Sequence, residues 1–168
     1  MAAAIAVAIG ALAGMVVLVV HIRADESDVG HLRFASTTPA PAPFAEFDQT
    51  HVAVGARCLR VLVASTPNER EQGLREVRLL APFDGMLFVN PGDSTARFTM
   101  AETPTPLDIT FFSGAGVPVD RQQMTPCPAG SDATCPVYES KQSYRYALER
   151  PTGSSGASAS GNLGPCAA

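Results

Sequence analysis

Two kinds of hydrophobic pattern divide this chain of 168 residues. Residues 2–20 are apolar and carry no charge. A helix of that length, at about 1.5 Å per residue, spans roughly 28 Å, close to the hydrocarbon core of a bilayer. Beyond residue 52 the apolar runs are short and are separated by turn residues, which is typical of strands. The pattern predicts a membrane anchor followed by a β-rich domain.

The apolar segment is predicted to be a retained transmembrane anchor, or uncleaved signal, over residues 1–23. No small-residue cleavage site follows it, and it exceeds the core of an ordinary signal peptide. A cleaved signal peptide is the alternative. Arg23 follows the segment and no basic residue precedes it, so the positive-inside rule favours a cytoplasmic domain. The even number of cysteines favours disulfides and therefore a domain outside the cytoplasm. We give the cysteines more weight because one arginine is a weak topological signal.

Composition marks three further segments. Residues 24–51 include an APAP run, which favours extended polyproline-like backbone and predicts a linker. Residues 52–150 hold the short apolar runs and have the length of one small domain. Residues 151–168 consist mainly of small and polar residues, which predicts a flexible tail.

The domain is predicted to contain one or two short helices and several strands. Thr66 is a good N-cap, Pro67 suits the first helical position and Glu69 completes a capping box, so we expect a helix over 67–75. Strands are expected at 58–64, 85–90, 96–100, 107–112, 117–124 and 143–149. The fold class is therefore α+β: a single compact β-rich domain of mostly antiparallel strands behind a transmembrane helix.

Charge and motifs exclude several classes of function. The net charge is −4 and no basic stripe is visible, so we expect no nucleic-acid partner. No histidine occurs after residue 51, which removes Ser-His-Asp and Cys-His triads from the domain. No phosphate-binding loop or dinucleotide fingerprint is present. The sequence accordingly predicts no catalytic residue and no cofactor.

Carboxylates are the remaining candidates for chemistry in the domain. They are Asp84, Asp93, Glu102, Asp108, Asp120, Asp132, Glu139 and Glu149. We expect most of them at the surface or in turns. Asp108 lies between apolar neighbours at the start of a strand, so it is either an outward strand residue or a partly buried carboxylate in a pocket. An alternative function follows: a hydrolase of envelope glycans that uses Asp108 with Glu102 or Asp120.

The four cysteines predict two disulfides. Seven residues separate Cys127 from Cys135, which is outside the usual spacing of zinc ligands, and no CxxC motif occurs. The three histidines all precede the domain. An even number of cysteines beside an export segment favours Cys127 with Cys135 and Cys58 with Cys166. Free thiols, a redox pair and a metal-handling site are the alternatives, and no metal ligands are assigned.

Five blocks in a fixed order resemble the domain-of-unknown-function-192 (DUF192) family, small prokaryotic proteins that are often exported or membrane-anchored. The blocks are VLVASTPNEREQGL, GMLFV, FTMAETPTPLDITFF, MTPCPAGSDATCPVY and YALERPTG. The resemblance covers roughly residues 58–150. It implies a compact, β-rich α+β fold and brings no established activity.

The third block differs from the pattern that the resemblance implies. The family usually has Trp-Met-Lys-Asn-Thr followed by Pro-Leu-Asp. Here Met100, Thr103, Pro106, Leu107 and Asp108 match, whereas Thr99, Ala101 and Glu102 replace the usual Trp, Lys and Asn. A pocket formed by this block therefore lacks the family's aromatic wall and cation in this chain.

These observations predict a binding or accessory module of the cell envelope. It is attached to the membrane through residues 2–20, with its domain outside the cytoplasm. The candidate ligand cleft is formed by Met100, Thr103 and Asp108. An envelope protein or a polysaccharide is the expected partner.

Overall fold

The computed structural model describes residues 32, 34, 36–129, 131–154 and 161–167. The predicted anchor lies outside these residues, and no helix within them is both long and apolar enough to cross a bilayer. The described strands are β1 (Thr38–Pro39), β2 (Asp48–Val54), β3 (Arg57–Ala64), β4 (Gly85–Ser94), β5 (Phe98–Thr99), β6 (Leu107–Phe112), β7 (Pro118–Met124), β8 (Val137–Tyr138), β9 (Tyr144–Pro151) and β10 (Leu163–Pro165), and the helix is α1 (Pro67–Gln72).

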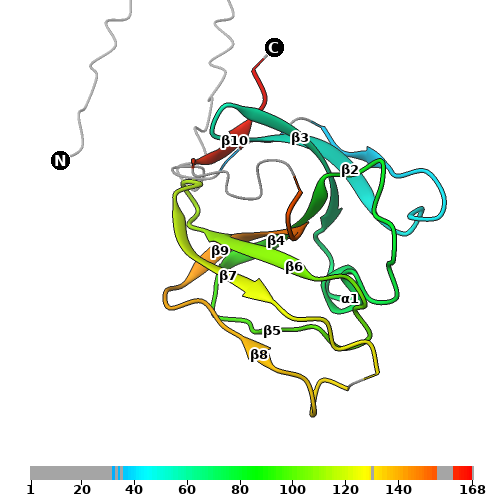
Figure 1. Cartoon of the computed structure of the whole chain (residues 1–168). Helices are drawn as coiled ribbons and strands as arrows, with labels where there is room; N and C mark the ends of the chain where they lie inside the picture. Colours follow the sequence, from blue (N-terminus) through cyan, green and yellow to red (C-terminus); the bar gives the residue numbers. More distant parts are fainter. Residues whose placement is uncertain (1–31, 33, 35, 130, 155–160, 168) are drawn as a thin grey trace, which may run out of the picture.

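Most of the strands belong to one sheet. Its order is β1-β2-β3-β4-β9-β6-β7, with β10 also paired to β2, while β5 and β8 form a separate two-stranded sheet. Figure 1 shows β10 at the top of the domain and the β5–β8 pair at the bottom. All pairings between named strands are antiparallel except β3 with β4. The predicted β-rich, mostly antiparallel domain with one short helix is therefore confirmed.

Helix α1 connects the two parallel strands β3 and β4, which a short hairpin turn cannot join. It begins with the predicted capping box: the Thr66 hydroxyl accepts a hydrogen bond from the Glu69 amide, and the Glu69 carboxylate accepts one from the Thr66 amide at 2.9 Å. Gly73 follows the helix with φ at 49°, a conformation that favours glycine. The α-helix ends at Gln72, earlier than predicted.

Apolar side chains cover both faces of the central strands. Successive residues of a strand point to opposite faces. Along β9, Ala147 belongs to one buried cluster, together with Met86 and Phe111, and Leu148 belongs to the other. Strand β9 is paired at both edges, with β4 and β6, and the two clusters cover its faces, so most of its residues are buried.

The folded region extends beyond the predicted limits at both ends. Strand β1 and the start of β2 fall within residues 24–51, and Phe44 and Phe47 of the same segment are buried in the first cluster. At the other end, β10 lies within the predicted flexible tail. Leu163 of β10 pairs with Val54 and is 2% exposed. Both segments gain order from pairing with β2.

Two disulfides join the cysteines in the pairs that the sequence predicted. Cys58 on β3 is bonded to Cys166, which follows β10. Cys127 is bonded to Cys135 and closes the loop before β8. All four cysteines of the chain are therefore paired.

Candidate functional site

A pocket of about 440 Å³ opens between α1, β4, β5 and β9. We call it the Glu149 pocket; its lining includes Leu74, Phe88, Phe98, Met100, Tyr144 and Glu149. The rings of Phe88 and Phe98 meet edge to face with their centroids 5.0 Å apart. The lining combines apolar side chains with a comparable share of polar and charged ones, and the volume is in the range typical of small-molecule sites.

Glu149 is the unusual member of the pocket lining. It is 4% exposed, and its neighbours on the adjacent strands are Met86 and Ile109, both fully buried. Burial alone raises the pKa of its carboxyl group to about 8, because no described residue forms a hydrogen bond or ion pair that compensates for lost hydration. The group therefore carries its proton at neutral pH and is a neutral hydrogen-bond donor.

Glu149 is an exception to the expectation that most carboxylates lie at the surface. Its burial follows from the central place of β9, which a local pattern does not reveal. Gly85 on β4 also allows β9 to lie close, because a Cβ atom at residue 85 would overlap the backbone oxygen of Glu149. The sequence did contain a signal: Glu149 lies two residues after Ala147 in the strand, and so on the same face.

Two of the three predicted cleft residues line the Glu149 pocket. Met100 and Thr103 follow β5 and are almost fully buried. The Thr103 amide donates to the Met100 carbonyl at 2.9 Å, and the Thr103 hydroxyl donates to the Ala101 carbonyl at 3.2 Å. This turn holds both side chains in the pocket wall opposite β9.

Asp108, the third predicted residue, does not line the pocket. Its neighbours Leu107 and Ile109 belong to the buried cluster on the pocket side of the sheet, so the alternation of β6 directs Asp108 to the other face. There it interacts electrostatically with Arg150, its partner on β9. The structure thus separates Asp108 from Met100 and Thr103.

The carboxylate pairs considered for a hydrolase are not brought together. Asp120 on β7 pairs with Phe111 of β6. Phe111 is three positions from Asp108 along β6, so Asp120 and Asp108 lie on opposite faces of the sheet. Its carboxylate accepts hydrogen bonds from the Gln122 side chain and the Lys141 amide. Glu102 is paired with Arg75 instead.

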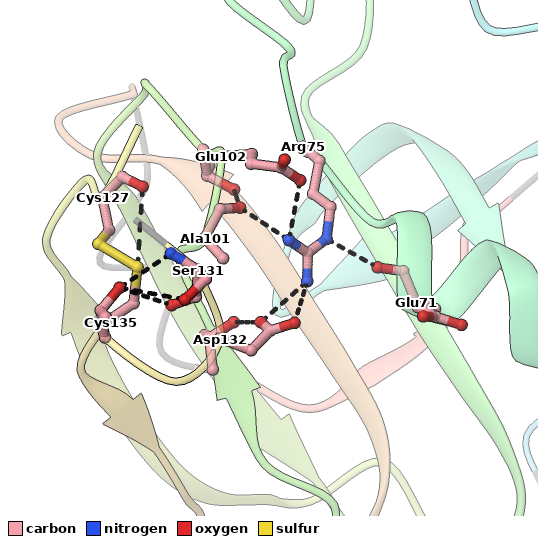
Figure 2. Close-up of polar contacts among 11 residues, drawn as sticks. Glu71, Arg75, Ala101, Glu102, Cys127, Ser131, Asp132 and Cys135 are labelled. Carbon is pink, nitrogen blue, oxygen red and sulfur yellow. Dashed lines mark hydrogen bonds and ion pairs between the residues drawn. A yellow bond between two sulfur atoms is a disulfide. The ribbon is translucent and has the colours of Figure 1, made fainter. Parts of the chain in front are cut away.

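Arg75 connects three segments that border the pocket. Its guanidinium donates to both carboxylate oxygens of Asp132 at 2.9 Å each and to the Glu102 carboxylate at 3.1 Å (Figure 2). It also donates to the backbone oxygens of Glu71 at 3.1 Å and Ala101 at 3.4 Å. Because Asp132 lies inside the loop closed by the second disulfide, Arg75 fastens that loop to the end of α1.

The departures in the third block contribute to this network. The Thr99 hydroxyl donates to Asp132, and hydrogen bonds from Thr99 and Arg75 lower the pKa of the Asp132 carboxyl group. Glu102 has φ at 57°, a left-handed conformation in which asparagine is more common. Its carboxylate forms the ion pair with Arg75. The polar replacements therefore bind the disulfide loop to the pocket wall.

Two further arginines lie at the mouth of the pocket. Arg70 on α1 donates to the backbone oxygens of Ser65 and Val89, the latter at 3.1 Å. Arg97 is exposed, and no other described residue forms a hydrogen bond or ion pair with its guanidinium. Arg97 thus offers an unpaired guanidinium at the mouth, where the exposed carboxylate of Glu71 also lies, whereas Arg75 is already paired.

The described residues offer no free thiol, since Cys127 and Cys135 are bonded to each other. Within the same residues, no group of three or more His, Cys, Asp or Glu side chains is placed to hold a metal ion.

Comparison with known proteins identifies the family. Residues 50–159 match DUF192, described as an uncharacterized ACR. A protein of unknown function from Novosphingobium aromaticivorans DSM 12444 has a similar fold, with a TM-score of 0.63, 20% identity and coverage of 77% of this chain and 91% of that one. A candidate transcription regulator from Sinorhizobium meliloti 1021 gives a TM-score of 0.60, 27% identity and coverage of 70% and 93%. No curated protein matches. The match extends over more than half of the chain, which therefore belongs to the DUF192 family.

Proposed function

We propose that this protein is a membrane-anchored binding module of the cell envelope and that the Glu149 pocket is its ligand site. One observation carries the proposal: the Glu149 side chain is only 4% exposed and lines the pocket, and no hydrogen bond or ion pair with a described residue offsets its loss of hydration. A fully buried polar group without a hydrogen bond costs about 1 to 3 kcal/mol, and Glu149, whose oxygens reach the pocket, incurs part of that cost. A ligand that supplies the missing bond recovers part of that cost on binding.

The surroundings of Glu149 suit recognition. Phe88 and Phe98 provide apolar walls, and Arg70 and Arg97 provide charge at the mouth. Polar groups placed beside apolar walls fix the orientation of a ligand. The domain has no histidine after residue 51 that could act as a general base. A binding role does not require one.

Blocking the mouth of the pocket is expected to abolish ligand binding. Ala96 is exposed and lines the pocket, so Ala96→Trp fills the mouth without disturbing the core. Benzoate, benzyl alcohol and N-acetylglucosamine serve as anionic, neutral aromatic and sugar probes. With isotope-labelled methionine methyl groups in the full-length chain in lipid nanodiscs, at least one probe should shift the Met100 resonance and not that of Met124, which does not line the pocket.

The matched control is Val117→Trp, which adds the same side chain at a position that is 46% exposed and outside the pocket lining. This variant should respond to the probes as the wild-type protein does. An unchanged Met100 resonance with all three probes, or an equal response from Ala96→Trp, would contradict the pocket as a ligand site.

The disulfides support a domain outside the cytoplasm, because such bonds persist mainly in oxidising compartments. Rapid alkylation of intact cells with a permeant thiol reagent, followed by a non-reducing peptide map, is expected to return both linked peptide pairs and no alkylated cysteine. After treatment with dithiothreitol, all four cysteines should become alkylated. Recovery of alkylated cysteines without reduction would place the domain in a reducing compartment and count against an envelope role.

A further inference from the structure

We propose that the Glu149 pocket selects small monocarboxylates that carry a hydrogen-bond-accepting oxygen at the end opposite the carboxylate. Glu149 contacts that oxygen inside the pocket, and Arg97 contacts the carboxylate at the mouth. This inference rests on the proposed function, because it requires the pocket to be a ligand site. It adds the chemical class of the ligand and its orientation.

The inner end of the ligand follows from the state of Glu149. Burial keeps its proton on at neutral pH, with a pKa of about 8, and its strand neighbours Met86 and Ile109 provide no acceptor from their side chains. A carbonyl, ether or hydroxyl oxygen accepts a hydrogen bond from the acid. A purely apolar group leaves the acid unpaired, and an ammonium group loses hydration without gaining a counter-charge.

The middle of the pocket requires an apolar and preferably flat body. Phe98 meets Phe88 edge to face and lies 6.3 Å from the ring of Tyr144 between centroids. The Tyr144 hydroxyl is already used, since it donates to the Ala96 carbonyl at 2.7 Å. These rings therefore contribute mainly apolar surface to the lining. Aromatic ligands pack well against the edges of aromatic side chains.

The outer end follows from the charges at the mouth. The single positive charge of Arg75 faces two carboxylates, those of Asp132 and Glu102, so Arg75 has no charge left to offer a ligand. The Arg97 guanidinium forms no ion pair with a described residue, and Arg70 donates only to backbone oxygens. The exposed Glu71 also lines the mouth, so the attraction for an anion comes from the unpaired guanidinium of Arg97, whose planar form suits a carboxylate.

Glu149 is the group that makes binding depend on pH. The other ionisable residues that line the pocket are Arg70, Glu71, Arg75, Arg97, Asp132 and Tyr144. The pKa of Asp132 is lowered by hydrogen bonds from Thr99 and Arg75, and burial raises that of Tyr144 to about 12. Neither Asp132 nor Tyr144 therefore changes charge in the pH range in which Glu149 titrates.

Four benzoic acid derivatives of similar shape test the inference on the full-length chain in nanodiscs. They are para-acetylbenzoate, para-ethylbenzoate, para-(aminomethyl)benzoate and para-acetylbenzamide. At about pH 6, para-acetylbenzoate should bind about fivefold to tenfold more tightly than para-ethylbenzoate, which is the effect of one net hydrogen bond. At about pH 9.5 that preference should disappear, because an ionised Glu149 no longer donates.

Two variants separate the inner contact from the outer one. Glu149→Gln keeps a donor that does not titrate, so it should retain the preference for the acetyl probe at both pH values. Arg97→Gln should weaken the binding of para-acetylbenzoate and para-ethylbenzoate about equally. It should leave the affinity for para-acetylbenzamide unchanged. Arg78→Gln removes the same charge from an exposed position outside the pocket lining and should change none of these affinities.

The outcomes distinguish this inference from the proposed function. Equal binding of the acetyl and ethyl probes at the lower pH, or tightest binding of the ammonium probe, would overturn the ligand class while leaving the pocket as a binding site. An Arg97→Gln variant with undiminished affinity for benzoates would overturn the proposed orientation. If none of the four probes binds at millimolar concentration, both the inference and the pocket as a ligand site fail.

Discussion

In mildly alkaline solution, Glu149→Gln is expected to be more stable than the wild-type protein by several kcal/mol. The pKa of Glu149 rises from 4.5 for an unperturbed glutamate to about 8 in the folded protein, because of burial. Between these values the unfolded chain has released its proton and the folded chain has kept it. The free energy of unfolding therefore decreases by about 1.4 kcal/mol per pH unit as the pH rises, to a total on the order of 5 kcal/mol.

The glutamine side chain does not titrate, so this decrease should be absent from the variant. Below pH 4.5 the two proteins should have similar stability, since Glu149 is protonated in both states there. Urea unfolding of the full-length chain in nonionic detergent, followed by circular dichroism across this pH range, measures the difference. Glu139→Gln removes an exposed glutamate and should retain the wild-type pH dependence. Parallel curves for the wild type and Glu149→Gln would show that Glu149 is not a buried acid.

Removal of the Cys58–Cys166 disulfide is expected to cost about 4 to 5 kcal/mol of stability on the chain-entropy model. The two cysteines are 108 residues apart in sequence, so the bond restricts a very long loop in the unfolded chain. The bond also holds β10 beside β2, where Leu163 packs into the second buried cluster. Replacing both cysteines with serine should therefore lower the free energy of unfolding and expose β10 to hydrogen exchange.

The second disulfide provides the matched comparison, because the same two serine replacements there also remove one bond. Cys127 and Cys135 are only eight residues apart, so the same model gives a loss of about 2 to 3 kcal/mol. Urea unfolding of both double variants tests the ranking. A cost at Cys127 and Cys135 that equals or exceeds the cost at Cys58 and Cys166 would mean that native contacts of the loop, and not chain entropy, dominate.

Elements with strong local signals could be predicted from the sequence. The capping box at Thr66 and Glu69 determines the start of α1, and the β-branched run of β3 favours a strand through its local sequence. Strands β1, β8 and β10 are only two or three residues long, and β1 and β10 include proline or glycine. They exist because a partner strand supplies their hydrogen bonds, and such pairing is not encoded locally.

The site was predictable to the extent that it lies in one segment. Met100 and Thr103 share a block whose resemblance to the family pointed to a cleft. Glu149 enters the site only because β9 pairs with β4 and β6, which are distant in sequence. Asp108 attracted attention through its apolar neighbours, but those neighbours occupy the buried face and direct it away from the pocket.

The bond between Cys58 and Cys166 also bears on how the protein tolerates cleavage. Together with the intervening chain it forms a covalent ring that contains α1 and every strand from β4 to β10. A protease that nicks the ring once, for example in the turn between β6 and β7, releases no fragment until the bond is reduced. The two new ends stay at high effective concentration, so the nicked strands can pair again within one molecule.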